Sequence, residues 1–513
     1  MARIGIDGRM YRPGATGIGR YIFEITKKIF EFDTENDYFL FLNEEAFLKF
    51  ECNNPKVTKI KTDANYYSLS EQTIFLKDLI NYNLDLVHFT HFNAPILYNK
   101  PFIVTIHDLT LSKFPGQKMN SFIHRAAYNL TIKTITKKAD RIISVSENTK
   151  QDIESILGID GNKIDVIYEG ITEKFIKTKD AKVIKNVRDK FMIKGDYILY
   201  VGVWRNHKNL VGLIKAFDAF KSKVDKDIKL LVTGKEDNIH YPEVRKTIDN
   251  CLNKSDIITP GFVSEDDLVV LYSEANALVN PSFYEGFGFP PLEAMSCETP
   301  VVLSDASCHR EICGDAALYF DPNNLIDIAL NLEKVVYDKK VISILKKNAK
   351  ERVKIFKWDD AAKKTYQIYL DILANHKNKI DLKKNIIGDI NSNIDTLKNY
   401  SKDILNESKV LQEKAMYDFK NKELLTTSAK NYKNLYIKLN GLISTLKGVT
   451  FSAEVASNNT GLEVLNKTLS EIKSNLSDVK ENGVKWKNIN NAFNRIHSFA
   501  DQVKAMILSS IKK

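Results

Sequence analysis

The sequence predicts an α/β protein with two doubly wound domains of parallel strands, followed by an all-α domain that forms a helical bundle or a coiled coil. Through residue 375, short apolar and β-branched runs alternate with longer segments of helical period, which is typical of parallel sheets flanked by helices. At least nine such runs occur, too many for one small sheet. From residue 376 the strand signal ends, and apolar residues recur every three or four positions.

The predicted strands fall into two series. The first includes ARIGIDG, DLVHFTH, FIVTIHD, RIISVS and KIDVIYEG, and the second includes YILYVGV, IKLLVTG, ALVNPS and PVVLSD. Residues 172–195 between them are charged and poor in strand signal, so we expect domains at residues 1–175 and 176–375. Ligands of such sheets bind beyond the carboxyl ends of the strands. A cleft between the two domains is therefore the expected active site.

Residues 376–513 form the third predicted domain, a helical extension. They contain neither proline nor cysteine. Small residues at 447–461, and Gly483, interrupt the helical period, so three or four helices that fold back are expected. We interpret the extension as helices for oligomerisation or partner binding, with a basic amphipathic membrane-surface element as the alternative. The apolar positions are Ile386, Ile390, Ile394, Leu397, Ile404, Leu405, Leu435, Leu439, Leu442, Leu446, Leu462, Leu465, Leu469, Ile472 and Leu476.

Composition excludes several classes of function. The formal net charge of +10 lies mostly in the helical extension, and no basic patch with stacking aromatics indicates nucleic-acid binding. No segment approaches about 18 uncharged apolar residues, and charges stand where a signal peptide would be apolar. Five cysteines without a CxxC pair predict reduced thiols rather than a zinc site. We expect a cytoplasmic protein, with peripheral contact at the inner membrane face as the alternative.

The stretch NPSFYEGFGFPPLEAM carries two glutamates eight positions apart, Glu285 and Glu293, in a setting of glycines and prolines. It follows a predicted buried strand, and its two prolines suit the first turn of the next helix. Gly286 and Gly288 let the backbone approach a ligand closely, and free N–H groups at the helix start attract an anion. The two carboxylates can accept hydrogen bonds from a ribose diol and from a sugar hydroxyl.

The segment FVSEDDLVVLYSEANALVNPSFYEGFGFPPLEAMSCETPVVLSDAS resembles the donor-binding half of glycosyltransferase family 4, retaining enzymes with two Rossmann-like domains facing a cleft, the GT-B fold. The resemblance covers about residues 1–375, including a late helix that in such folds crosses back onto the first domain. It does not cover the helical extension. In the family, glutamates at this spacing bind a nucleotide sugar. The resemblance implies a catalytic, sugar-binding role for Glu285, ribose binding by Glu293, and donor contacts from Gly286, Phe287 and Gly288.

The loop YVGVWRNHKNL carries Arg205, His207 and Lys208 between a strand and a helix. The helix dipole opposes cations at a helix start, so these side chains make sense if they clamp a diphosphate. Lys208 matches the family's lysine in this loop, whereas His207 stands where an arginine usually precedes it. We expect Arg205 and Lys208 to bind the donor, with solvated surface charge as the alternative.

The loop RPGATGIGRYIFE follows the first strand and opens a helix with Gly14, Gly17 and Gly19. Such a loop would also suit a dinucleotide site, but the strand YFLFLN ends in asparagine rather than in the acid that NAD binding requires. The resemblance implies that the loop lies across the cleft, close to the donor phosphates and the acceptor. We therefore expect donor contacts from Gly17 and Gly19.

His107 and Asp108 end the strand FIVTIHD and are expected to face the cleft. A lone histidine is more often a structural residue. The family places a histidine here beside the sugar, which implies a donor-sugar or catalytic role for His107. Asp108 is expected to cap the following helix or to orient its neighbours.

Two further polar segments leave their roles open. Ser146 and Asn148 in SVSENTK resemble a family segment at the end of the first domain, but either residue also suits a helix N-cap. Glu311 matches the family pattern after PVVLSDAS, beside the unusual His309 and Arg310.

We expect neither a metal ion nor a cofactor. Asp225 and Asp227 have the spacing of a metal-binding Asp-x-Asp pair, but they lie between a helix and a strand start, remote from the predicted cleft. A solvated turn is the favoured interpretation. Arginine and lysine would replace a divalent cation in neutralising the departing diphosphate.

These features predict a retaining, metal-independent hexosyltransferase of polysaccharide biosynthesis. Its donor would be a nucleotide diphosphate sugar, and its acceptor a hydroxyl of a cell-surface glycan, lipid-linked sugar or glycoprotein. GDP-mannose is the first expectation because the WRNHKN loop is similar to that of mannosyltransferase-like members, with UDP-sugars close behind. The rival prediction is a non-catalytic scaffold whose helical extension assembles a complex. The extension is expected to form a homo-oligomer or to bind a partner protein.

Overall fold

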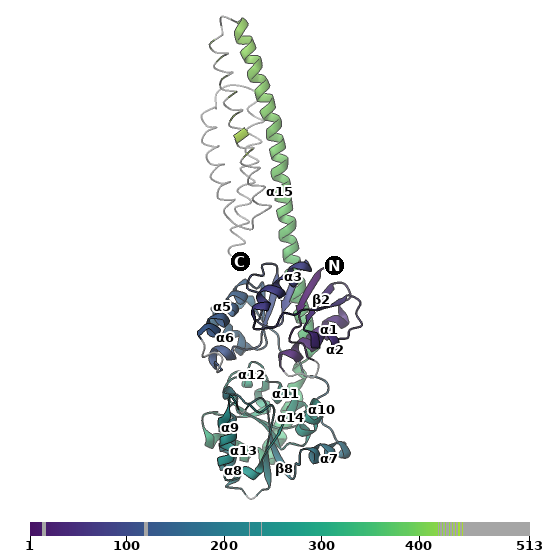
Figure 1. Ribbon diagram of the computed structural model, residues 1–513, viewed down its shortest axis with the longest axis vertical. Helices are drawn as coiled ribbons and strands as arrows, with labels where there is room; N and C mark the ends of the chain where they lie inside the picture. The colour runs from purple at the N-terminus through teal and green to yellow at the C-terminus, as the bar shows by residue number, and fades with distance from the viewer. Residues whose placement is uncertain are drawn as a thin grey trace. The chain divides into compact units, whose positions relative to one another are not determined.

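A computed structural model of the protein (Figure 1) describes residues 1–12, 17–116, 122–224, 226–237 and 239–418, with a few single positions up to residue 444. The chain separates into two compact units, Met1–Ala374 and Asn375–Lys513. Several residues discussed above lie outside the described part. They are Gly14, Asp225, residues 447–461, Gly483 and the apolar positions from Leu435 onward. In the described part, no helix is long and apolar enough to cross a membrane.

The first unit contains two lobes, each built on a parallel sheet, and this confirms the predicted fold class (Figure 1). The N-terminal sheet has the strand order β3-β2-β1-β4-β5-β6-β7. Its strands are β1 (Arg3–Asp7), β2 (Asp37–Leu42), β3 (Val57–Lys61), β4 (Leu86–Phe89), β5 (Phe102–Ile106), β6 (Arg141–Ser144) and β7 (Ile164–Val166). The helical elements of this lobe are α1 (Ile18–Phe32), α2 (Glu44–Lys49), the π-helical turn η1 (Glu71–Phe75), α3 (Leu76–Asn81), α4 (Thr110–Lys113), α5 (Phe122–Lys138), α6 (Glu147–Leu157) and the 3-10 turn η3 (Gly161–Lys163).

The C-terminal sheet has the strand order β10-β9-β8-β11-β12-β13. Its strands are β8 (Asp196–Val201), β9 (Ile228–Thr233), β10 (Ile257–Gly261), β11 (Ala277–Asn280), β12 (Val301–Ser304) and β13 (Ala317–Phe320). The helices are α7 (Ala181–Lys190), α8 (Leu210–Lys221), α9 (Pro242–Asn250), α10 (Glu265–Glu274), α11 (Phe289–Ser296), α12 (His309–Cys313), α13 (Leu325–Tyr337), α14 (Lys339–Arg352) and α15 (Trp358–Tyr417). Short 3-10 turns are η4 (Asn206–Lys208), η5 (Lys254–Asp256), η6 (Gly314–Ala316) and η7 (Val353–Ile355).

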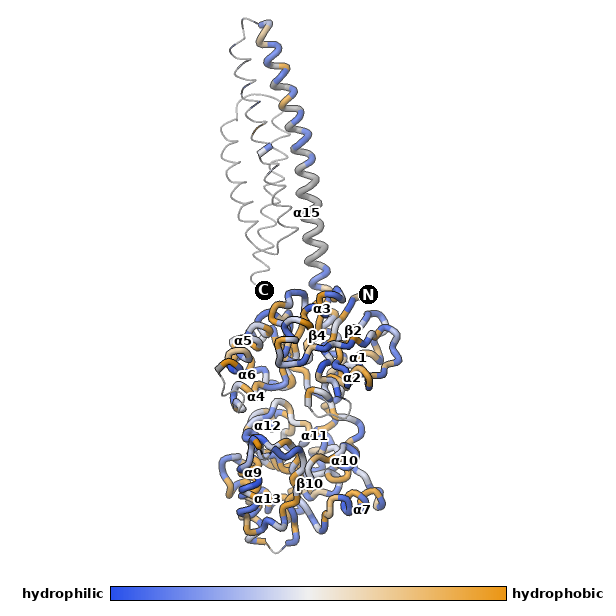
Figure 2. Tube along the Cα trace, viewed as in Figure 1, coloured by the Kyte–Doolittle hydropathy of each residue, from blue (hydrophilic) through white to orange (hydrophobic). Residues whose placement is uncertain are grey.

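The central strands are apolar on both faces because helices cover both sides of a parallel sheet. Every residue of β4, β5, β11 and β12 is buried. Figure 2 shows the corresponding apolar segments inside both lobes, with hydrophilic residues around them. All five cysteines are free thiols, and among them Cys52 is exposed.

The start of α15 belongs to the core of the N-terminal lobe, although it follows the C-terminal lobe in sequence. Trp358, Ala362 and Tyr369 pack in a cluster with residues of β1, β2 and α1. The Tyr369 hydroxyl lies 2.6 Å from Nδ1 of His88 on β4. The chain therefore crosses between the lobes a second time, and the start of α15 ties the C-terminal lobe to the core of the N-terminal lobe. Helix α15 continues to Tyr417, so the helical prediction is confirmed for the described residues from 376 to 417.

Candidate active site

The strand order of each sheet reverses at one point, and several of the predicted site residues lie in loops beyond these points. In the C-terminal sheet the reversal falls between β8 and β11, and in the N-terminal sheet between β1 and β4. Loops beyond such reversals are where open parallel sheets bind ligands. Lys208 follows β8 and Glu285 follows β11, so the loops that carry them start on either side of the same reversal.

Glu285 is held entirely by residues of its own lobe. The Lys208 ammonium donates to both carboxylate oxygens, at 2.7 Å and 2.8 Å. Ser282 Oγ donates to the carboxylate at 2.7 Å and Asn280 Nδ2 at 3.3 Å. Burial acts to raise the pKa of Glu285, but Lys208, His309 and these hydrogen bonds outweigh it and lower the pKa to about 2. The carboxylate is therefore ionised at neutral pH.

The loop after β8 distributes its charges unevenly. Lys208 is paired with Glu285, whereas Arg205 is exposed and forms no ion pair with the described residues. His207 is buried, and burial together with the charge of Lys208 lowers its pKa to about 4. His207 is therefore neutral at physiological pH. Of the three side chains, Arg205 and Lys208 carry the positive charge that the prediction requires.

The glycines between the two glutamates bring the loop against the other lobe. A Cβ atom on Gly286 would lie 2.0 Å from the carbonyl oxygen of His107, so no larger residue fits without movement. The Gly286 carbonyl accepts a hydrogen bond from Ser146 Oγ at 2.6 Å. Gly288 has φ of 97°, which glycine adopts without strain, and Phe287 between them is buried.

Glu293 is held from across the lobes. It lies on α11, which begins with two prolines as the sequence predicts. Its Oε2 accepts a hydrogen bond from the Tyr272 hydroxyl at 2.8 Å, and its Oε1 pairs with the guanidinium of Arg20 on α1. Arg20 also donates to Glu265 at 2.7 Å. Sequence reasoning missed Arg20, although it stands directly after the glycine loop.

The glycine loop leads into the helix that carries Arg20. Gly17 is the residue before α1 and has φ of 65°, a left-handed value that favours glycine. Gly19 is buried within the first turn of α1. Donor contacts from these two glycines stay a prediction.

His107 lies just beyond β5, with little exposure. Its Nε2 is 3.0 Å from the Thr90 carbonyl and its Nδ1 is 3.2 Å from Glu169. The Tyr21 ring packs edge-on against it at 4.8 Å. Both ring nitrogens are therefore occupied within the lobe. Asp108 beside it accepts a hydrogen bond from the N–H of Thr110 at 2.7 Å and so holds the start of α4.

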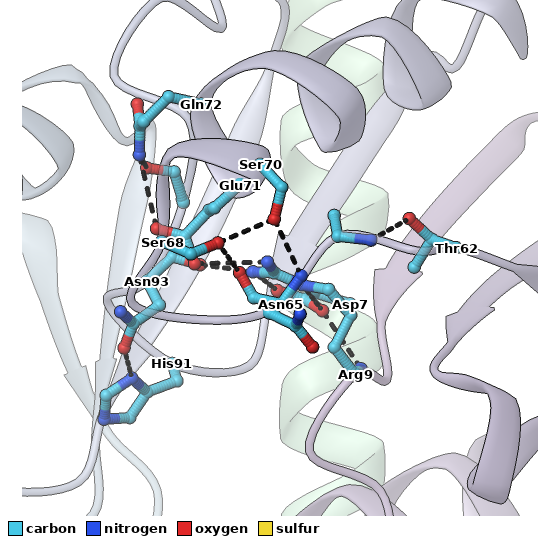
Figure 3. A network of polar contacts seen from close by, with 12 residues as sticks. Asp7, Arg9, Thr62, Asn65, Ser68, Ser70, Glu71, Gln72, His91 and Asn93 are labelled. Atoms are coloured by element: carbon cyan, nitrogen blue, oxygen red, sulfur yellow. Dashed lines mark hydrogen bonds and ion pairs between the residues drawn. The ribbon is translucent and has the colours of Figure 1, made fainter.

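A buried polar network occupies the reversal point of the N-terminal sheet (Figure 3). Arg9 donates to Asp7 at 2.8 Å and to Glu71 at 3.1 Å, and it also donates to the Asn93 carbonyl at 2.8 Å. His91 Nδ1 is hydrogen-bonded to the side-chain oxygen of Asn93. Burial, with His107 nearby, lowers the pKa of His91 to about 3, so it is neutral. The network fixes the loops beyond β1 and β4 relative to each other.

Sequence reasoning also missed Arg9, Glu71 and His91. Two charged residues at the end of the first buried strand and just beyond it, Asp7 and Arg9, were a usable signal because a reversal point often follows the first strand. Glu71 gave no such signal, since it lies in a π-helical turn far from any strand end.

A second contact between the lobes involves Glu311 and Ser146, whose roles the sequence left open. Glu311 accepts hydrogen bonds from the backbone N–H groups of Glu147 and Asn148, at 2.6 Å and 2.9 Å, at the start of α6. Ser146 caps the same helix by accepting from the N–H of Thr149. A carboxylate at a helix N-terminus is favourable because the helix dipole is positive there. These contacts give Glu311 and Ser146 a role in joining the lobes.

His309 and Arg310 differ in environment. Nδ1 of His309 lies 2.9 Å from the Ser304 carbonyl, and its Nε2 is buried with no partner among the described residues. Arg310 is exposed and pairs with Asp305 at the surface.

The acids with Asp-x-Asp spacing were expected in a solvated turn, and the described one, Asp227, has an exposed side chain. Asp227 pairs with Lys229 at 2.9 Å, and in the described part of the chain no group of three or more His, Cys, Asp or Glu residues could hold a metal ion. A cavity of about 660 Å³ lies in the N-terminal lobe, and no predicted donor-binding residue lines it. Its lining consists of Tyr11, Phe23, Thr26, Lys27, Phe30, Glu31, Thr34, Phe50, Glu51, Cys52, Asn53, Asn54 and Pro55.

Each lobe matches a model of a glycosyltransferase family. Residues 16–175 match the family described as Glycosyltransferase Family 4, and residues 184–352 match Glycosyl transferases group 1. The chain is 31% identical over 251 residues to the O-antigen chain mannosyltransferase RfbU of Salmonella typhimurium, covering 48% of this chain and 64% of that protein. It is 26% identical over 270 residues to O-antigen chain mannosyltransferase B of Escherichia coli, covering 52% and 69%. The chain thus spans just under two thirds of RfbU.

Solved structures with low sequence identity share the fold. Sucrose-phosphate synthase from Thermosynechococcus elongatus superposes with a TM-score of 0.60 at 19% identity, covering 73% of this chain and 100% of that one. HepE from Anabaena, solved in complex with UDP and glucose, has a TM-score of 0.58 at 16% identity, covering 72% and 100%. WaaG, a glycosyltransferase involved in lipopolysaccharide biosynthesis, has a TM-score of 0.57 at 14% identity, covering 71% and 99%. These likenesses confirm the predicted GT-B fold.

Proposed function

We propose that the chain is a retaining enzyme of glycosyltransferase family 4 that moves a hexose from a nucleotide diphosphate sugar to a hydroxyl of a cell-surface glycan, since family models match both lobes. One observation carries the proposal. Lys208 and Glu285 meet beyond two neighbouring strands at the reversal point of the sheet, where a cation and an ionised carboxylate face the same space. A diphosphate needs the cation, and a sugar hydroxyl can donate to the carboxylate.

Four side chains are proposed to bind the donor during the reaction. Lys208 and Arg205 neutralise the departing diphosphate, and Glu285 holds the sugar. His107 is proposed to contact the sugar after giving up one of its present hydrogen-bond partners. Lys208 changes partner in this scheme. In the free protein its ammonium donates hydrogen bonds to Glu285, and the diphosphate of the donor is proposed to accept some of them. These cations do the work of a divalent metal ion, so metal-independence is part of the proposal. Contact between the lobes excludes water while the acceptor hydroxyl approaches.

GDP-mannose is the proposed donor, with UDP-sugars as the alternative. The mannose assignment is supported by the relatives, which include two O-antigen chain mannosyltransferases. HepE was solved with UDP, which keeps UDP-sugars in the test. A glycan, a lipid-linked sugar or a glycoprotein is the proposed acceptor, and a cytoplasmic site of action stays a prediction.

The experiment is a donor screen with the full-length protein. Release of nucleoside diphosphate is measured with GDP-mannose, UDP-glucose, UDP-galactose and UDP-N-acetylglucosamine, each with and without EDTA. We expect release from GDP-mannose, unaffected by EDTA, and an α-linked product whose anomeric configuration matches that of the donor by NMR. Transfer from a UDP-sugar alone would correct the donor, inversion would overturn retention, and no turnover with any donor would favour the scaffold.

The helical extension is proposed to assemble copies of the chain or to recruit a partner protein. The scaffold reading is not favoured, because Glu285, Lys208 and their partners are intact. Light scattering of the full-length chain and of residues 1–375 tests the assembly role, and equal oligomeric states would count against it. Flotation with anionic liposomes at two salt concentrations tests membrane contact, since charge-driven binding weakens as salt rises.

A further inference from the structure

Arg20 forms a buried ion-paired bridge from one lobe to the other. It lies on α1 of the N-terminal lobe, while its partners Glu265 and Glu293 lie on α10 and α11 of the C-terminal lobe (Figure 1). The Arg20 side chain is 4% exposed and that of Glu293 is 5% exposed. A charge this deeply buried is costly unless it is paired, so the contact is a fixed part of the structure in this state.

The surroundings of Arg20 hold it in place. The rings of Phe175 and Phe289 lie 5.4 Å from its guanidinium carbon. Removing one partner of a buried ion pair is strongly unfavourable because the other charge is left unpaired. A ligand hydroxyl, which carries no charge, is a poor replacement for this guanidinium. We therefore expect Arg20 to stay on Glu293 when a nucleotide binds.

Glu293 keeps acceptor capacity beside this contact. Arg20 occupies one carboxylate oxygen and the Tyr272 hydroxyl occupies the other, each with one hydrogen bond from the described residues. An ionised carboxylate has about four acceptor positions, so about two remain. Two is the number of donors that a ribose 2′,3′-diol offers. Arg20 limits the orientation of the carboxylate by holding one of its oxygens.

We propose that Arg20 is a positioning residue that sets how strongly the protein distinguishes ribose from deoxyribose in the nucleoside diphosphate of its donor. Arg20 acts through Glu293 and touches no reacting atom. The inference rests on the proposed function, in which Glu293 reads the ribose. It adds that the reading carboxylate is aligned by the opposite lobe, on the helix that the glycine loop opens.

The test compares matched nucleotides by calorimetry with the full-length protein. Wild type and Arg20→Ala are titrated with GDP and 2′-deoxy-GDP, and with UDP and 2′-deoxy-UDP. Hydrogen bonds to a charged group are worth enough that wild type should prefer the ribose form by about tenfold or more. In Arg20→Ala this preference should fall below about threefold, because a free Glu293 is no longer aligned by its partner.

Other variants separate this role from a general loss of structure. Arg20→Lys should keep more of the preference than Arg20→Gln, since lysine retains the charge, and this pair carries the test if Arg20→Ala does not fold. Lys174→Ala is the matched control. Lys174 contacts Glu265 at 3.7 Å and Asp266 at 2.6 Å but does not contact Glu293, so its removal should leave the ribose preference unchanged.

Three results would overturn the inference. One is a folded Arg20→Ala protein with the wild-type preference. Another is a larger preference and tighter binding in that variant, which would mean that Arg20 competes with the ribose for Glu293. The third is a wild-type preference near one in a protein that still transfers sugar, which leaves the proposed function intact. A wild type that binds no nucleoside diphosphate and transfers no sugar overturns the proposed function instead.

Discussion

The two glutamates of one short motif are held in different ways. Glu285 is surrounded by its own lobe, with Lys208, Ser282 and Asn280 as partners. Glu293, eight positions later, pairs with Arg20 of the other lobe. The first carboxylate can therefore be in place whatever the lobes do, whereas the second is complete only when they are in contact. The difference teaches that the proposed sugar and ribose sites depend differently on the contact between the lobes.

Replacing Lys208 removes the ion pair with Glu285 inside one lobe, and it has the largest expected effect on activity. Lys208→Ala removes the cation proposed to stabilise the leaving diphosphate and leaves Glu285 unpaired. We expect kcat to fall about 100-fold or more, as for loss of other charge-stabilising groups. Steady-state kinetics with the identified donor measures the effect. A loss of less than about tenfold in a folded variant would contradict the assignment.

Gly286→Ala tests the contact between lobes. The added Cβ would lie 2.0 Å from the His107 carbonyl, which is backbone and cannot turn away, so the loop and the opposite lobe must separate. We expect a loss of about 1–3 kcal/mol in unfolding free energy, together with a drop in kcat/KM. Gly158→Ala is the control for backbone strain without a clash, because its φ of 68° is left-handed and no atom lies within 4 Å of the new Cβ. It should lose about 1 kcal/mol and keep its activity, whereas an unchanged kcat/KM in Gly286→Ala would argue against a steric separation of the lobes.

The pH dependence of stability tests how strongly the partners in its own lobe stabilise the ionised Glu285 carboxylate. The pKa of Glu285 is about 2 in the folded protein and 4.5 in its ordinary state, so its ionisation favours the folded protein above about pH 5. This contribution is lost as pH falls from about 5 towards 2. Between pH 7 and pH 3 wild type should lose about 2 kcal/mol more than Glu285→Gln, which lacks the titrating group. Urea unfolding at both pH values measures this, and parallel losses would place the shift elsewhere.

The smallest effect is expected at an ion pair that contacts neither Glu285 nor Glu293. Arg310 and Asp305 pair at the surface, with 61% and 44% of their side chains exposed. Exposed pairs are worth about 0–1 kcal/mol, so Arg310→Ala should change the unfolding free energy by less than about 1 kcal/mol. A larger change would mean that the Arg310–Asp305 pair helps to hold the lobes together, as Glu311 of the same helix does.

Much of the architecture could be predicted from the sequence. The runs ALVNPS and FIVTIHD became buried central strands because continuous apolar runs between turns have few other stable uses. The motif with Glu285 and the lysine after β8 could be located because the topology of a parallel sheet brings successive strand ends to one edge. Ser146 was predicted as one of two candidate N-caps, and the structure shows that it is the cap.

Other features were decided by the tertiary structure. Arg20 and Glu293 are 273 positions apart, and nothing local to either residue names the other as its partner. The same holds for Arg9 with Glu71 and for Glu311 at the start of α6. Sequence periodicity and spacing report on neighbours along a helix or a strand. Ion pairs between distant segments arise only when packing has brought the segments together and burial has made an unpaired charge costly. The sequence by itself therefore determined which residues carry the proposed chemistry, and the tertiary structure decided which of them depend on the opposite lobe.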